Sequence, residues 1–187
     1  MDTICRCGWC NPRNPLYIDY HDHEWGLPQY DDGKLFELLI LESFQAGLAW
    51  ETILNKREAF RAAFDGFDPE TVAAYGAEKT AALLSDKSIV RNRRKIAAAV
   101  QNAKIFLEIQ REWGSFSRYI RHFTDGRVVR ETGKASSPLS DRVSADLKKR
   151  GMTFVGTTIV YAYLQAIGVI DSHEPGCFLY SGENPGP

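Results

Sequence analysis

The sequence predicts an all-α protein. Apolar residues recur at helical spacing through most of the chain, and helix-capping residues stand in front of several of these stretches. No segment shows the alternation of apolar and polar residues that would indicate a convincing strand. The chain has 187 residues, 44% hydrophobic and 25% charged, which is an ordinary globular balance and enough for one domain with its own core.

The predicted helices follow one another closely. Asp31 and Asp32 cap a helix that Gly47 ends, and Asp68-Pro69 opens another, to about Tyr75, with proline at the first helical position. The remaining helices are expected at about 49–64, 78–84, 91–113, 116–123, 140–150 and 157–167, with a hairpin at 151–156. We interpret 124–140 as a polar loop, and both the aromatic opening and the tail from Gly176 as irregular.

Bulk charge does not indicate a nucleic-acid partner, because 23 basic and 24 acidic residues give a net charge of −1. Any anionic ligand must meet local basic clusters, although such runs are also common at solvated helix ends. The two clusters are Arg91, Arg93, Arg94 and Lys95, and Lys148, Lys149 and Arg150.

Nothing in the chain indicates a membrane or a secretory pathway. No stretch approaches the ~20 apolar residues that a membrane span needs. The N-terminus lacks the basic region and apolar run of a secretory signal. We therefore expect a cytoplasmic protein.

The four cysteines indicate a metal site, because three lie within the first ten residues and the fourth near the other end. His173 and Cys177 are spaced to reach one ion, and the N-terminal segment offers Cys7 with either His21 or His23. Such a Cys2His2 zinc site joins two irregular ends that bury little surface, and its closed coordination indicates a structural role. The alternative set is Cys5, Cys7 and Cys10 with Cys177.

Aromatic residues gather in the first fifty positions, and Glu42 lies among them at the end of an apolar helical run. A pocket for a flat base needs stacking faces and a few polar groups at the base edge. The alternative is that Glu42 faces solvent and the aromatic residues fill the core. These residues are Trp9, Tyr17, Tyr20, Trp25, Tyr30, Phe36, Phe44 and Trp50.

Several motifs carry a resemblance to a known family: RCGW at 6–9, PLYIDYHDHEWGLP at 15–28, LESFQAGLAW at 41–50 and FVGTTIVYAYLQA at 154–166, followed by His173 and Cys177. In order and spacing they resemble the 3-methyladenine-DNA glycosylase I family over nearly the whole chain. The resemblance implies a helix-hairpin-helix glycosylase fold and a monofunctional repair enzyme. Such an enzyme flips 3-methyladenine from the duplex, hydrolyses its N-glycosidic bond and leaves an abasic site.

The resemblance also implies partners and a cofactor. The partners are double-stranded DNA containing alkylated adenine and the free 3-methyladenine product, and we expect a monomer. The expected cofactor is zinc. We expect one domain, 1–187, in which residues 1–30 and 171–187 form a terminal subdomain held together by the zinc ion. The implied zinc ligands are Cys7, His21, His173 and Cys177, which leaves His23, Cys5 and Cys10 as bystanders.

The base pocket implied by the resemblance contains Glu42, Tyr20 and Trp50, with Trp9, Tyr17 and Trp25 nearby. Aromatic faces favour a cationic ring, and an ionised Glu42 would accept a hydrogen bond from the exocyclic amine or stabilise a cationic sugar. We favour the first role. Ser43 and Phe44 depart from the smaller, more polar pair of the family, and 10–14 is slightly longer.

The DNA contacts are expected at two places. Leu48, beside Gly47, is a candidate wedge for the gap left by a flipped base, with a core leucine as the alternative. The hairpin is the second place, where helix N-terminal amides bind phosphate, or else it is an ordinary helix connection. Its candidate residues are Lys149, Arg150, Gly151, Gly156 and Thr157.

Catalysis by a lysine Schiff base is not expected, because no lysine follows the helix after the hairpin. Asp171 lies near the position where many helix-hairpin-helix glycosylases carry an aspartate, but the family is not expected to depend on it. Two alternative functions remain, a non-catalytic zinc-containing DNA- or RNA-binding module and a glycosylase for another lesion such as 7-methylguanine.

Overall fold

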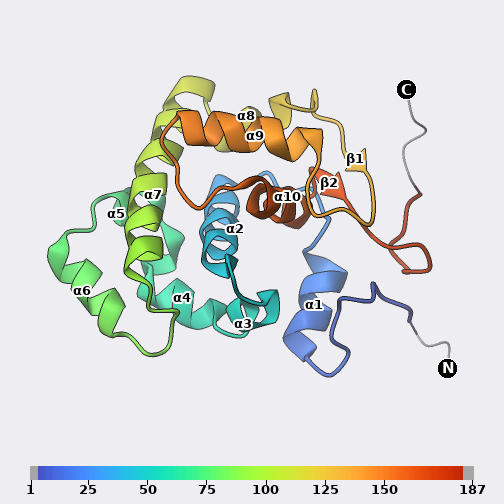
Figure 1. Ribbon diagram of the computed structural model, residues 1–187, viewed down its shortest axis with the longest axis horizontal. Helices are drawn as coiled ribbons and strands as arrows, with labels where there is room; N and C mark the ends of the chain where they lie inside the picture. Colours follow the sequence, from blue (N-terminus) through green and yellow to red (C-terminus); the bar gives the residue numbers. More distant parts are fainter. Residues whose placement is uncertain (1–3, 183–187) are drawn as a thin grey trace.

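The computed structural model describes residues 4–182, so the predictions made for 1–3 and 183–187 lie outside the described residues. The chain is mostly helical, as the sequence predicts (Figure 1). The elements are α1 (Pro15–His23), α2 (Asp32–Gln45), α3 (Trp50–Leu54), α4 (Arg57–Ala63), η1 (Asp65–Phe67), α5 (Pro69–Ala73), α6 (Ala77–Ser85), α7 (Arg93–Trp113), α8 (Phe116–His122), β1 (Val129–Arg130), α9 (Pro138–Lys149), α10 (Thr157–Ala166) and β2 (Ile170–Asp171).

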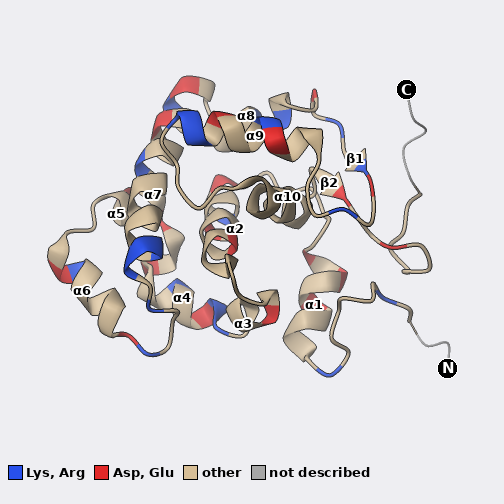
Figure 2. Ribbon diagram, viewed as in Figure 1, with Lys and Arg blue, Asp and Glu red and all other residues tan. Residues whose placement is uncertain are grey.

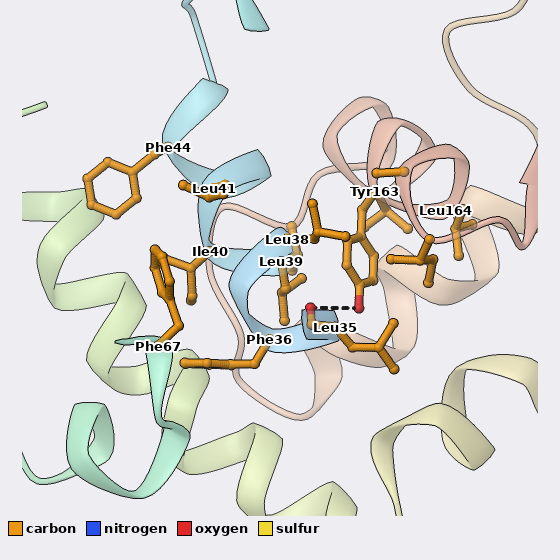
Figure 3. Packing of buried hydrophobic residues seen from close by; sticks show 14 of the residues in the cluster. Leu35, Phe36, Leu38, Leu39, Ile40, Leu41, Phe44, Phe67, Tyr163 and Leu164 are labelled. Carbon is orange, nitrogen blue, oxygen red and sulfur yellow. Dashed lines mark hydrogen bonds between the residues drawn. The ribbon is translucent and has the colours of Figure 1, made fainter. Parts of the chain in front are cut away.

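Helix α2 lies at the centre of the fold. The Asp31 carboxylate caps it by accepting a hydrogen bond from Lys34 N at 2.9 Å. Its residues from Leu35 to Phe44 are buried all round, because α7, α8, α10 and η1 pack against different sides. Figure 3 shows Phe67 and Tyr163 among these side chains, with the Tyr163 hydroxyl donating to the Leu35 carbonyl at 3.1 Å. The C-terminal turns of α2 therefore carry Glu42 into the interior.

The prediction of an irregular opening is wrong between Pro15 and His23, where α1 forms. Asn14 caps this helix by accepting from Leu16 N, and Pro15 occupies its first turn, so the local start signal is present in the sequence. The described segments near the two ends of the chain meet, because Phe178 N donates to the Cys5 carbonyl at 2.9 Å.

Three other features of the secondary structure differ from the sequence prediction. The helix expected at 49–64 is two helices, α3 and α4. Helix α9 begins at Pro138, because Ser137 and Ser140 form a capping box ahead of the expected start. Strands β1 and β2 form a two-residue parallel pair, too short to leave an alternating pattern in the sequence.

Residues 150–156 connect α9 to α10 and are held by α7. The Asn102 amide donates to Thr153 O at 2.9 Å and accepts from Thr153 N at 3.0 Å. Gly151 has φ +101°, a conformation that favours glycine, and Gly156 precedes the first turn of α10. Because Asn102 is fully buried, this connection has a defined position against the core.

Basic and acidic side chains are interspersed over the elements (Figure 2), as the balanced composition predicts. No helix within 4–182 is both long enough and apolar enough to cross a membrane.

Candidate active site

A cavity of about 310 Å³ lies where α1, α2, α3 and α10 meet the two terminal segments. All six residues predicted for the base pocket line it. The full lining is Trp9, Tyr17, Tyr20, Trp25, Glu42, Gln45, Trp50, Gly133, Lys134, Ala162, Gln165, Ser172 and Glu174. The sequence prediction thus selects residues that the fold brings together from α1, α2, α3 and the loops before and after α1.

Glu42 lies at the buried end of this cavity. It is 3% exposed, so the alternative of a solvent-facing carboxylate is wrong. Its Oε2 atom and the Trp50 Nε1 atom are both buried without a hydrogen-bond partner among the described residues. A buried acceptor and a buried donor left unpaired are costly in a folded protein. Together they indicate a site for a ligand with a matching donor and acceptor.

Burial raises the pKa of Glu42 to about 8. The carboxyl group of the empty pocket is therefore mostly neutral at pH 7. A cation in the cavity favours the carboxylate, because opposite charges at short distance lower a carboxyl pKa. The charge on Glu42 thus depends on what occupies the pocket.

The aromatic residues form two groups around the cavity. The Tyr20 and Trp50 rings, whose centroids are 5.2 Å apart, line the cavity together with Glu42. The centroid of the Trp9 ring lies 5.4 Å from that of Tyr17 and 4.7 Å from that of Trp25. These faces suit a flat, electron-poor ring, which interacts favourably with aromatic side chains.

Ser43 and Phe44, the pair that departs from the family pattern, do not line the cavity. The Ser43 hydroxyl donates to the Leu39 carbonyl at 2.8 Å, and the Phe44 ring packs on Phe60 at 4.9 Å. The departure therefore changes the core behind α2, and it leaves the pocket wall intact.

A candidate metal centre lies beside the cavity, where the two ends of the chain meet. Ligand atoms of Cys7, His21 and Cys177 lie within 4.8 Å of one another, and all three residues are buried. The His173 ring lies 5.5 Å from that of His21, and its Nε2 atom is buried without a partner among the described residues. This donor set of two thiols and two imidazoles fits the preferences of zinc.

Two carboxylates orient the histidines of this centre. Asp22 Oδ1 lies 2.8 Å from His21 Nδ1, and Asp171 Oδ1 lies 2.7 Å from His173 Nδ1. Both rings are thereby held in one orientation through Nδ1, the arrangement common for metal-binding histidines. His21 Nε2 lies 3.5 Å from Cys177 Sγ and accepts from Cys7 N at 3.3 Å, whereas His173 Nε2 has no partner among the described residues. Sequence reasoning missed both roles, and Asp171, which does not line the cavity, acts here on His173.

The residues considered as bystanders lie apart from this group. His23 is exposed and pairs with Asp19 at 2.9 Å, and Cys5 is exposed. Cys10 is buried, and its thiol contacts the Tyr17 carbonyl at 3.6 Å. The described residues bring neither Cys5 nor Cys10 into the group with Cys177.

The predicted wedge lies on the loop between α2 and α3. Leu48 is 40% exposed, so the alternative of a core leucine is wrong, and Gly47 before it has φ +78°. Lys95 holds the start of this loop, since its Nζ donates to Phe44 O at 2.7 Å and to Ala46 O at 2.6 Å. Lys95 is thus a buried residue that caps the C-terminus of α2. Contrary to the sequence prediction, it does not belong to an exposed basic cluster with Arg91, Arg93 and Arg94.

The residues predicted for the hairpin differ in their contacts. Lys149 is exposed, whereas Arg150 donates to Asp146 at 2.8 Å and to Glu112 at 2.6 Å. The Thr157 hydroxyl donates to Asp141 at 2.6 Å. Arg150 and Thr157 therefore fix the connection between α7, α9 and α10.

Comparison with known proteins agrees with this geometry. The methyladenine glycosylase family model matches residues 9–180. This chain belongs to the methyladenine glycosylase family. It is 44% identical to DNA-3-methyladenine glycosylase 1 of Escherichia coli over 186 residues, covering 96% of this chain and 99% of that protein.

Solved structures of methyladenine glycosylases have the same fold. A crystal structure of 3-methyladenine DNA glycosylase I is 43% identical, with a TM-score of 0.90 over 94% of this chain and all of that one. A variant of 3-methyladenine DNA glycosylase I, solved in complex with 3-methyladenine, is 36% identical, also with a TM-score of 0.90, over 96% and 99% of the two chains.

Proposed function

We propose that the protein is a monofunctional DNA glycosylase that excises 3-methyladenine from alkylated DNA and leaves an abasic site. Its relatives carry that activity in their names, and one was solved with the base bound. The observation that carries the proposal is the unpaired Glu42 acceptor beside the unpaired Trp50 donor, within an aromatic cavity.

The two unpaired groups match an adenine edge. Adenine presents an amino donor next to a ring-nitrogen acceptor, whereas guanine presents two acceptors on the corresponding edge. Glu42 would accept from the amino group and Trp50 Nε1 would donate to the ring nitrogen. This pairing favours 3-methyladenine over 7-methylguanine, because on the same edge 7-methylguanine has its N7 blocked by the methyl group and presents only the O6 acceptor, which leaves the Glu42 carboxylate without a donor.

Positive charge is the second element of selectivity. Adenine alkylated at N3 is cationic while it is attached to the sugar, and the Glu42 carboxylate and the aromatic faces stabilise that charge. The glycosidic bond is already weak, because its electron pair leaves with the base and neutralises it. Unmodified adenine lacks both the charge and the weak bond, so it is held less strongly and stays attached.

The proposed DNA grip uses the Leu48 loop and the connection between α9 and α10, as a helix-hairpin-helix unit. Supporting it are the exposure of Leu48, the exposed Lys149 and the glycine-bounded N-terminus of α10. Extruding one nucleotide costs a few kcal/mol of unstacking, which a wedge offsets by filling the gap. Pocket and grip are built from one chain, which supports action as a monomer.

Zinc is the proposed resident metal, held by Cys7, His21, His173 and Cys177. The close approach of three of these residues and the unpaired Nε2 of His173 support this set. When bound, the ion supplies structural cross-linking, and four protein ligands leave no open position for chemistry. We extend the proposal to one domain whose ends, 1–30 and 171–187, form a zinc-stapled subdomain.

Incubation with methylated double-stranded DNA tests the proposal, with released bases identified by chromatography. We expect free 3-methyladenine, little 7-methylguanine and unbroken strands with abasic sites. Trp50→Ala should lower the affinity for free 3-methyladenine by ~1–3 kcal/mol, the worth of one stacked base. DNA binding without release of any base would refute the proposal in favour of a non-catalytic zinc-containing DNA- or RNA-binding module.

A further inference from the structure

Besides Glu42, the cavity is lined by a second and more exposed carboxylate, Glu174. Glu42 and Glu174 are the acidic residues of its lining. Burial raises the pKa of Glu42 without a contribution from a charged neighbour, so Glu174 does not act on it directly. Glu174 follows β2, and it shares its end of the cavity with the terminal segments.

The two ends differ in their exposure to solvent. Around Glu42, the side chains of Tyr20 and Trp50 are buried. Gly133 and Lys134, which also line the cavity, are exposed, and Glu174 is half-buried. A flipped nucleotide remains attached to the DNA backbone, so its base enters the buried end and its sugar stays at the exposed end.

The Glu174 side chain is held in a fixed place. Its Oε2 accepts from Gly8 N at 2.5 Å, and its own backbone N donates to Cys7 Sγ at 3.3 Å. A carboxylate held in place by Gly8 N therefore lines the more exposed part of the cavity, the part in which we expect the sugar.

We propose that Glu174 stabilises the positive charge that develops on the deoxyribose as the glycosidic bond breaks. The inference rests on the proposed glycosylase function. As the bond between the base nitrogen and C1′ breaks, its electron pair goes to the base, which becomes neutral, and the sugar becomes an oxocarbenium ion. Water then attacks C1′ and releases a proton to solvent, giving the abasic sugar.

Glu42 and Glu174 thus have successive roles. Positive charge lies on the base before cleavage, opposite Glu42, and on the sugar during cleavage, opposite Glu174. A group that stabilises only the later state accelerates the reaction, because it lowers the barrier without deepening the ground state. Glu174 is in this sense the catalytic carboxylate, and Glu42 selects the base.

Glu174→Gln tests the role, because an amide oxygen still accepts from Gly8 N while the charge is lost. We expect single-turnover excision of 3-methyladenine to slow on the order of tenfold to a hundredfold. Affinity for free 3-methyladenine, measured by calorimetry, should stay within about twofold. Glu108→Gln, at an exposed site on α7, makes the same charge change away from the cavity and should leave the excision rate unchanged.

A second measurement does not depend on excision. Duplexes carrying a protonated pyrrolidine or a neutral tetrahydrofuran at the abasic position mimic the charged and uncharged sugar. The parent protein should prefer the cationic duplex by about tenfold or more, and Glu174→Gln should remove that preference. An unchanged excision rate, an unchanged preference, or a slower rate with an equal loss of base affinity would overturn the inference. A different outcome would refute the glycosylase proposal alone. In that outcome the parent protein does not excise 3-methyladenine, although it prefers the cationic duplex and Glu174→Gln removes this preference.

Discussion

Glu42→Gln should make the empty protein more stable while it weakens base recognition. The substitution keeps the shape of the side chain and removes a carboxyl group whose ionisation is opposed by burial. Because the pKa rises from 4.5 to about 8 on folding, the folded state binds an extra proton between these values. Stability associated with this group is complete below about pH 4.5 and is lost as the pH rises through 8.

The difference in free energy of unfolding between variant and parent grows by about 1.36 kcal/mol for each pH unit between 4.5 and about 8. At pH 7 the variant should exceed the parent in free energy of unfolding by roughly 3 kcal/mol, and above pH 9 by nearly 5 kcal/mol. Near pH 4 the two proteins should be equal. The side chain is fully buried, so solvent screening does not reduce this difference.

Urea unfolding at pH 4, 7 and 9 measures the difference, with Glu108→Gln as an exposed control whose difference from the parent should not depend on pH in this way. Calorimetry on the same samples should show that Glu42→Gln loses ~1–3 kcal/mol of affinity for free 3-methyladenine. Parallel pH profiles for parent and Glu42→Gln would refute the reasoning, since Glu42 would then be solvated or paired.

Three further predictions concern the metal and the DNA. Cys177→Ser should abolish the binding of about one zinc per chain and lower the melting temperature more than Cys5→Ser, and equal losses would contradict the ligand assignment. Lys149→Ala should reduce the slope of log affinity against log salt by about one, whereas Arg150→Ala should act mainly on stability, because its guanidinium bridges two helices. Leu48→Ala should weaken binding and excision of lesion-containing duplex with an unchanged melting temperature, and a large loss of stability would show that Leu48 supports the core.

Local signals predict the helices of this protein well, because caps and apolar spacing act within a few residues of the chain. Asp31 in front of α2 and Pro69 at the start of α5 are examples. The same signal stands at Asn14 in front of α1, but the many aromatic residues of this segment obscure its helical spacing. The break between α3 and α4 has no proline to mark it, so spacing alone joined them.

The site depends on contacts between distant segments, and there the sequence is less informative. Its residue types were predictable, but the unpaired state of Glu42 Oε2 and the raised Glu42 pKa follow from burial by several elements. Lys95 belongs by sequence to a basic cluster, yet it caps a helix that lies 49 residues away. Arg150 is neutralised by Glu112, 38 residues earlier. Such pairings leave no local pattern.

The distribution of tryptophan gives this protein an optical property. Of its four indoles, Trp9, Trp25 and Trp50 line one cavity, and Trp113 lies on α7, stacked on His122 at 4.4 Å. Three of the four indoles therefore lie at the walls of the proposed base pocket, where a bound purine should change their emission. Trp113→Phe would remove the constant background, and the remaining signal would follow occupancy of the pocket in real time without an attached dye.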